Sequence, residues 1–146
     1  MINSDFRKEM ADSWFSFLQT QICKEFEFLE EGKKKFIKRD WQKNNKNEGG
    51  GTSFTLLGGK IFEKVGVNKS TVSGKFEKKF REKILGAAKN GKYWASGISV
   101  VAHMANPKIP AIHFNTRFIV TSKEWFGGGV DVTPSHKDLK EKKLVH

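Results

Sequence analysis

Polar side chains that could bind a ligand or take part in a reaction fall at alternate positions of two neighbouring apolar segments. The segments are SGISVVAHM, which begins at Ser96, and AIHFNTRFIV, which begins at Ala111. Residues two apart in a β-strand share a face. The polar residues that share a face in this way are Ser99 and His103 in the first segment, and His113, Asn115 and Arg117 in the second. This set has the capacity to bind an anion and to transfer a proton.

An antiparallel pairing of the two strands would bring this set together. We expect His103 to lie opposite His113, which places Ser99 opposite Arg117 and joins the polar groups on one face. The alternative is an ordinary solvated sheet face. Two histidines also allow metal ligation, although a histidine pair without cysteines or nearby carboxylates is a weak metal signal.

A third stretch, EWFGGGVDVTP from Glu124 to Pro134, sets an aromatic pair, three glycines and one carboxylate side by side. Consecutive glycines cost backbone entropy and give nothing to a core. They therefore mark either a turn before Asp131 or a place where something comes close to the backbone.

The elements that must position these residues begin with one long amphipathic helix from Ser4 to about Glu31, with Gly32 as its stop. Its apolar residues recur every three or four positions: Phe6, Met10, Trp14, Phe17, Leu18, Ile22, Phe26 and Leu29. Residues 32–48 are rich in lysine and asparagine and are typical of a solvated connector.

Residues 49–74 alternate short apolar runs with glycines, which favours antiparallel strands, and Gly58-Gly59 suits a two-residue hairpin turn. The spacing of Phe76, Phe80, Ile84 and Leu85 predicts a second helix that ends at Gly91. The segment ANPKIP between the two polar strands carries two prolines and is typical of a loop. Residues 135–146 resemble the start of a helix.

Composition indicates one domain over residues 1–146. The net charge of +11 favours an anionic partner, which can be nucleic acid, a membrane surface or a small polycarboxylate. No apolar run approaches the ~20 residues that span a bilayer, and the first residues lack the apolar core of a signal peptide, so we expect a cytoplasmic protein. The single cysteine, Cys23, lies within the helical pattern and is expected to be a buried, inert thiol.

The sequence lacks residues that several nucleotide-binding and nucleic-acid-binding motifs require. A Walker loop needs glycine directly before Lys-Ser/Thr, whereas Lys69 and Ser70 follow Asn68. One cysteine cannot supply a zinc finger, and no RNA-recognition aromatic motif is present. The chain is basic and contains aromatic residues, so nucleic-acid binding without these motifs is an alternative.

Three runs of this chain resemble the oxygen-dependent coproporphyrinogen III oxidase family: GGGTSFTLLGGKIFEKVGVNKSTVSG, ASGISVVAHMANPKIPAIHFNTRF and WFGGGVDVTP. The resemblance implies haem biosynthesis by oxidative decarboxylation. Two propionates of coproporphyrinogen III become vinyl groups to give protoporphyrinogen IX, while O2 is consumed and CO2 and hydrogen peroxide are released. It implies no organic cofactor.

The resemblance also implies roles for the polar residues. Ser99, Asn115, Thr116 and Arg117 match substrate-contacting positions, and Arg117 would hold a propionate as a forked donor. His113 matches the position proposed as proton donor. Asp131 matches the carboxylate proposed to contact pyrrole N–H groups and assist deprotonation, and the neighbouring Trp125 and Phe126 would shape the cleft.

His103, His113 and His146 match the histidines that bacterial members are suggested to use for a divalent metal cation. The implied fold is α+β, a broad antiparallel sheet flanked by helices on both faces and assembled as a homodimer. The resemblance covers the N-terminal half of a family member, so we expect an apparently truncated domain with an unpaired sheet edge and an open apolar face.

Two hypotheses from different classes follow. The chain is a coproporphyrinogen oxidase, or an inactive N-terminal fragment that needs its missing half. Alternatively, it is a basic, non-catalytic binding module for nucleic acid or porphyrin.

Overall fold

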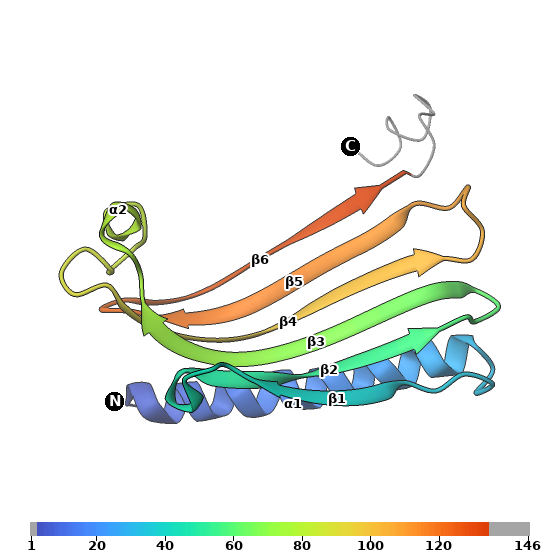
Figure 1. The fold of residues 1–146 in the computed structure, drawn as a ribbon, viewed down its shortest axis with the longest axis horizontal. Helices are drawn as coiled ribbons and strands as arrows, with labels where there is room; N and C mark the ends of the chain where they lie inside the picture. The colour runs from blue at the N-terminus through green and yellow to red at the C-terminus, as the bar shows by residue number, and fades with distance from the viewer. Residues whose placement is uncertain (1–2, 135–146) are drawn as a thin grey trace.

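A computed structural model describes residues 3–134, which form a six-stranded antiparallel sheet with one long helix against it (Figure 1). The elements in chain order are α1 Ser4–Leu29, β1 Ile37–Gln42, the 3-10 turn η1 Lys46–Glu48, β2 Gly49–Leu57, β3 Phe62–Lys75, α2 Lys78–Arg81, β4 Lys92–Met104, β5 Ala111–Val120 and β6 Glu124–Thr133. Each strand pairs with the next one in the sequence, so the sheet is a simple meander. The predicted α+β class and the broad antiparallel sheet are confirmed.

The helix α1 begins and ends where its sequence predicts. The side chain of Asn3 caps its first turn by accepting a 2.8 Å hydrogen bond from the Phe6 N–H, and Glu30 is the C-cap. Gly32 follows with a positive φ of 69°, a conformation that glycine adopts without steric cost.

The buried face of α1 differs from the predicted stripe. The buried residues recur four apart, at Ala11, Phe15, Gln19 and Cys23. Trp14 and Phe17, by contrast, are each 53% exposed. The helix has apolar residues on more than one face and packs mainly on β3 and β4, so the sheet covers only a narrow stripe of it.

The core lies between α1 and the strands it crosses. Buried side chains alternate along the strands, as expected for a sheet with one covered face: Leu56, Val65, Val67, Ile98, Val100, Ala102 and Phe118. Three polar side chains of the described residues are also buried, Gln19, Glu30 and Ser96. The Gln19 amide donates to the carbonyls of Thr52 at 2.8 Å and Val67 at 3.0 Å. The helix is thereby tied to the backbones of β2 and β3.

Two predicted connections are wrong. Residues 37–42, within the predicted connector, form the edge strand β1, because their pairing with β2 supplies backbone hydrogen bonds that composition does not reveal. The β2–β3 hairpin has a loop over residues 58–61 in place of a two-residue turn. The buried carboxylate of Glu30 accepts from the backbone N–H groups of Lys60, Ile61 and Phe62, which opens the turn.

The predicted second helix is also shorter than expected. It spans only Lys78–Arg81, and Gly86 follows with a positive φ of 71° that interrupts the helical pattern. The glycine stretch near the C-terminus is the extended strand β6, so its interpretation as a turn is wrong. The helix predicted for residues 135–146 lies outside the described residues.

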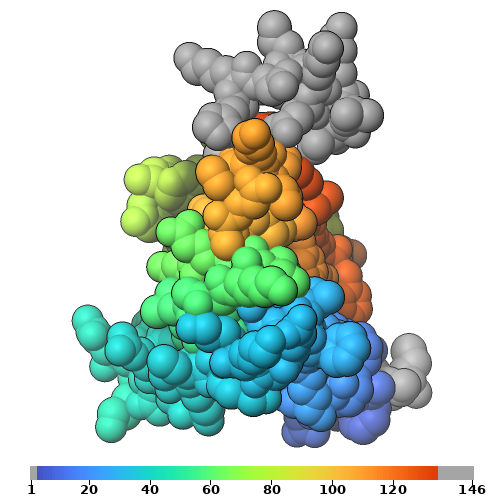
Figure 2. All heavy atoms as spheres, turned by 90° about the vertical axis from the view of Figure 1, so that its right-hand side faces the viewer, coloured from blue at the N-terminus to red at the C-terminus, as the bar shows by residue number. Residues whose placement is uncertain are grey.

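The helix-side face of the sheet continues beyond α1 as an open apolar surface. Phe126 and Val130 of β6 are 66% and 74% exposed on this side. Figure 2 looks along the sheet and shows α1 in blue beside the first strands, with β5 and β6 in orange and red extending past it. This is the open apolar face that the resemblance implies. Over residues 3–134, no helix has the length and apolar character needed to cross a bilayer.

Candidate functional site

The register of β4 and β5 differs from the predicted one by two residues. Ser99 lies opposite Asn115, Val101 opposite His113, and Gly97 opposite Arg117. Strand alternation has a period of two, so this shift leaves all the polar residues on one face.

Strand alternation specifies which residues share a face but not which residues lie opposite each other, so periodicity could not distinguish the two registers. The Ala105 N–H donates to the Ile61 carbonyl at 2.8 Å, and the loop closes as a turn in which the Ile109 N–H donates to Asn106. His103 lies opposite Lys64 of β3, and Val101 rather than His103 lies opposite His113.

The five registers align the residues of the helix-free face in rows that cross all six strands. One row is polar along almost its whole length: Arg39, Ser53, Asn68, Ser99, Asn115 and Gly129. The next row combines an indole, bare backbone and a guanidinium: Trp41, Gly51, Ser70, Gly97, Arg117 and Gly127. Hydrogen-bonding groups thus lie beside a stretch of sheet with little side-chain cover.

A pocket of about 560 Å³ lies over these rows. Its lining includes Ser99, His113, Asn115 and Arg117, together with Trp41 and other residues of β2 to β4. The Ser99 hydroxyl and His113 Nε2 are 3.2 Å apart. Arg117 Nη2 donates to Asn115 Oδ1 at 2.8 Å, so the amide orients the guanidinium. The structure therefore brings these predicted residues together.

Thr116 and Asp131 hold different positions relative to this pocket. Thr116 lines it, although alternation directs its side chain to the helix-side face, so its contribution there comes from the backbone. Asp131 lies on β6 directly opposite His113, one strand beyond the pocket lining. Its Oδ2 accepts from the Thr133 hydroxyl at 2.6 Å.

The glycines of β6 leave the middle of the strand next to the pocket without side chains on the open face. Gly127 lies opposite Arg117 and Gly129 opposite Asn115. A Cβ added at Gly129 would meet no heavy atom within 4 Å. Trp125 shares the open face with them, whereas Phe126 points to the helix side and packs on Phe118 with ring centroids 4.7 Å apart. The expectation that both aromatics shape one cleft is therefore wrong.

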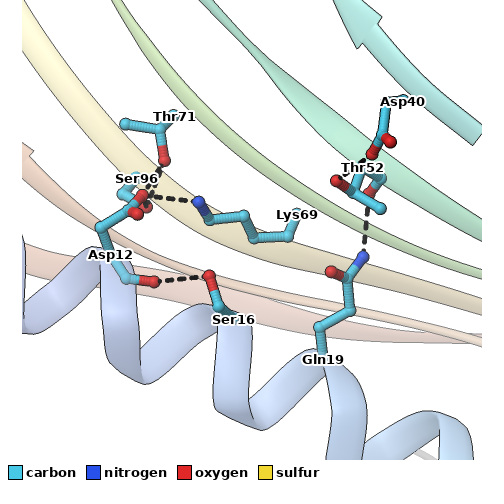
Figure 3. A network of polar contacts seen from close by, with 8 residues as sticks. All are labelled: Asp12, Ser16, Gln19, Asp40, Thr52, Lys69, Thr71 and Ser96. Atoms are coloured by element: carbon cyan, nitrogen blue, oxygen red, sulfur yellow. Dashed lines mark hydrogen bonds and ion pairs between the residues drawn. The ribbon is translucent and has the colours of Figure 1, made fainter.

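A polar network on the opposite side supports the strands beneath the pocket (Figure 3). The Asp12 carboxylate of α1 accepts from Lys69 Nζ at 2.6 Å and from Ser96 Oγ at 3.1 Å, and the Thr71 hydroxyl also donates to it. Burial alone raises the pKa of Asp12, but these hydrogen bonds and the Lys69 charge outweigh it and hold the pKa below its ordinary value. Sequence reasoning missed this network because Asp12 is an isolated acid within a helix.

Of the three histidines predicted to bind a metal, two lie in the part of the chain that the structure describes. His103 and His113 are exposed diagonal neighbours on the open face, and His146 lies outside the described residues. Within residues 3–134 no three His, Cys, Asp or Glu side chains form a group that could hold a metal ion. The donor set in this part of the chain is therefore incomplete for a structural site.

Cys23 is separate from the site. It is 7% exposed in the core beneath the sheet, and burial, with a smaller effect from the charge of Glu27, raises the pKa of its thiol to about 12. A thiol in this environment is protonated at neutral pH and is a poor nucleophile.

Comparison with known proteins points to one family. The profile described as coproporphyrinogen III oxidase matches residues 10–146. The oxygen-dependent coproporphyrinogen-III oxidases of Rickettsia felis and Rickettsia prowazekii are each 50% identical over 147 residues, which covers 95% of this chain and 52% of the relative. The Rickettsia akari protein of the same name is 48% identical over the same shares. The chain thus spans about half the length of the curated relatives it matches.

Proposed function

The chain belongs to the coproporphyrinogen III oxidase family, and from this premise we propose that its open sheet face binds coproporphyrinogen III for oxygen-dependent decarboxylation. The observation that supports this best is the 560 Å³ pocket lined by Ser99, His113, Asn115 and Arg117, next to which β6 presents glycines. A flat macrocycle with carboxylates at its rim needs bare backbone beneath it and cations at its edge. The net charge of +11 favours capture of such a polyanion.

The reaction that we propose takes each of two propionates to a vinyl group. A C–H bond and the bond to the carboxylate break, CO2 leaves, and the two electrons released reduce O2, which takes up protons to give hydrogen peroxide. O2 is the co-substrate, and no organic cofactor is part of the proposal.

Each residue has a role that its contacts support. Arg117, oriented by Asn115, binds a propionate as a forked donor. His113, which shares a hydrogen bond with Ser99, holds or moves a proton at the substrate. Asp131, across the strand pair from His113, accepts hydrogen bonds from pyrrole N–H groups and assists their deprotonation. Ser99 and the Thr116 backbone complete the contacts with the substrate.

We also propose which residues would hold a divalent metal, and we assign no reaction step to the metal. His103 and His113 would supply imidazole nitrogens, with His146 as the third ligand. A bound cation would supply Lewis-acid chemistry at the open face.

The assembly is proposed from the family and the length of its members. We propose that a segment equivalent to the rest of a relative covers the apolar surface at Phe126 and Val130, that the complete enzyme is a cytoplasmic homodimer, and that turnover needs that segment.

Binding of coproporphyrin III, the oxidised and fluorescent form of the ring, tests the proposal. We expect Arg117→Ala to weaken binding about tenfold, the loss of one charged hydrogen-bonding group. Lys38→Gln is the control, since Lys38 lies on the opposite face of β1 and pairs with Asp40 at 3.1 Å. Equal affinity of wild type and Arg117→Ala would show that the site is misassigned.

Turnover is tested separately, with the C-terminal half of a relative supplied in trans under air. Asp131→Ala should abolish any activity that this half restores, because deprotonation of the ring would lose its assisting carboxylate. Undiminished turnover by the variant would remove Asp131 from the mechanism.

The alternative, a basic non-catalytic module, rests on the +11 charge. It predicts nucleic-acid binding with a steep dependence on salt and no selectivity for porphyrins. A salt titration with single-stranded DNA and with coproporphyrin III distinguishes the two functions.

A further inference from the structure

A second pocket adjoins the first on the same open face. It has a volume of about 620 Å³ and shares Ser53 and Asn68 with the first pocket. Its basic lining residues are Arg39 of β1, Lys64 of β3 and His103 of β4, and its lining contains no acidic residue. Lys64 and His103 lie directly opposite each other in the β3–β4 ladder. Arg39 and Lys64 thus place two positive charges on the lining of the second pocket, from two different strands.

These cations have no counter-ions in the part of the chain that the structure describes. Among residues 3–134, Arg39 and Lys64 form no side-chain hydrogen bond or ion pair, whereas their neighbours on the helix-side face are paired. Lys38 binds Asp40 at 3.1 Å, and Lys69 binds Asp12 at 2.6 Å. Like charges that gather without an anion repel each other. A bound carboxylate would relieve this repulsion.

The spacing suits one ligand that spans both pockets. Arg39 and Asn115 belong to the same row and lie four strands apart, which corresponds to roughly 19 Å between backbones at the usual spacing of strands. Arg117 is one row away from Asn115. Arginine side chains are long enough to cover part of this distance, so the guanidinium groups of Arg39 and Arg117 can contact opposite edges of a macrocycle.

We propose that the pocket lined by Arg39 and Lys64 is a second carboxylate subsite, which holds one propionate of a tetrapyrrole while Arg117 holds another. This inference rests on the proposed function and deepens it. The subsite would favour a ring with a carboxylate on every pyrrole, which can reach both sites from opposite edges, over a ring whose two carboxylates lie on adjacent pyrroles. Because the reaction removes two carboxylates, the same contacts would favour binding of substrate over product.

Two porphyrins that differ in carboxylate number test this subsite. Coproporphyrin III carries four carboxylates and mesoporphyrin IX carries two. Both are titrated by fluorescence, at one fixed ionic strength, into the wild-type chain and the variants Arg39→Gln, Lys64→Gln and Lys38→Gln. We expect each of the first two variants to weaken binding of coproporphyrin about tenfold and of mesoporphyrin less than twofold. The control, Lys38→Gln, removes the same charge from the opposite face and should change neither affinity.

The other outcomes show whether the subsite proposal fails alone or together with the proposed function on which it rests. Equal weakening for both porphyrins would overturn the subsite, because it would show a general effect of charge. Unchanged affinities in Arg39→Gln and Lys64→Gln, with weakened binding in Arg117→Ala, would overturn the subsite alone. If the wild-type chain bound neither porphyrin, both proposals would fail. Arg39 and Lys64 are exposed, so these variants should fold, which thermal melts verify.

Discussion

Two glycines of the open face allow the demands of folding to be separated from those of ligand binding. A Cβ added at Gly97 would lie 2.6 Å from the Thr116 carbonyl oxygen and 2.7 Å from Arg117 Cβ. A Cβ at Gly129 would meet nothing within 4 Å. Both residues lie in strands on the same face, and each is one row or less from Asn115. Gly97 is therefore needed for the pairing of β4 with β5, whereas Gly129 is dispensable for folding.

The magnitudes follow from these distances. Gly97→Ala forces β4 and β5 apart, and overpacking of this kind costs about 2 kcal/mol. For a chain of this length the melting temperature should fall by roughly 4–8 °C. Gly129→Leu should change stability by less than about 0.5 kcal/mol, as expected for an open surface position. Its side chain would occupy the space where the macrocycle is proposed to lie, so we expect coproporphyrin affinity to fall at least tenfold, or ~1.4 kcal/mol.

Thermal melts followed by circular dichroism measure the first effect, and porphyrin fluorescence titration measures the second. Ser13→Leu, at an exposed position of α1 on the other side of the sheet, is a control for added bulk in the binding assay. If Gly129→Leu melted like the wild type and bound coproporphyrin equally well, the proposed role of the uncovered β6 backbone in binding would be refuted. An unchanged melting temperature in Gly97→Ala would refute the steric argument.

The remaining predictions concern polar and thiol groups of α1 and its C-cap, on the helix side of the sheet. Glu30→Gln should lower stability by about 2 kcal/mol, because a carboxylate that accepts three backbone N–H groups is replaced by an amide; urea unfolding measures this, with exposed Glu31→Gln as the control. Backbone hydrogen bonds and the Lys34 charge outweigh the effect of burial and lower the pKa of Glu30, so its stabilisation is complete above the ordinary value of 4.5 and is lost as pH falls through the lowered pKa. The acid-induced fall in melting temperature should therefore be smaller in Glu30→Gln, and an identical pH profile would contradict this. Asp12→Asn should lower the melting temperature at pH 7 while exposed Asp5→Asn does not, and equal melting temperatures in both would exclude the Asp12 network as a support for the sheet. Cys23, whose pKa burial raises to about 12, should react with a thiol reagent at pH 8 only as fast as the protein unfolds; labelling in the native state at the rate of a free thiol would contradict its burial.

Local patterns explain what the sequence could predict. The long helix, the two polar strands and the division of Ser99, His113, Asn115 and Arg117 onto one face all follow from periodicity. A period of two is a property of each strand by itself, so the shared face survived an error of two residues in the register. Family membership was also readable, because the motifs are long stretches of sequence that need no fold to be compared.

Tertiary contacts decided the features that local patterns leave open. The register of β4 and β5 depends on backbone pairing between the two strands, and the wide β2–β3 turn depends on Glu30, which is distant in the chain. Strand β1 exists because β2 lies beside it, so Arg39 and Trp41 enter the site from a segment whose composition indicates a connector. The glycines of β6 form a strand for the same reason: their backbone groups pair with β5. Sequence thus determined which side chains share a face, while pairing between distant strands determined which of them are neighbours.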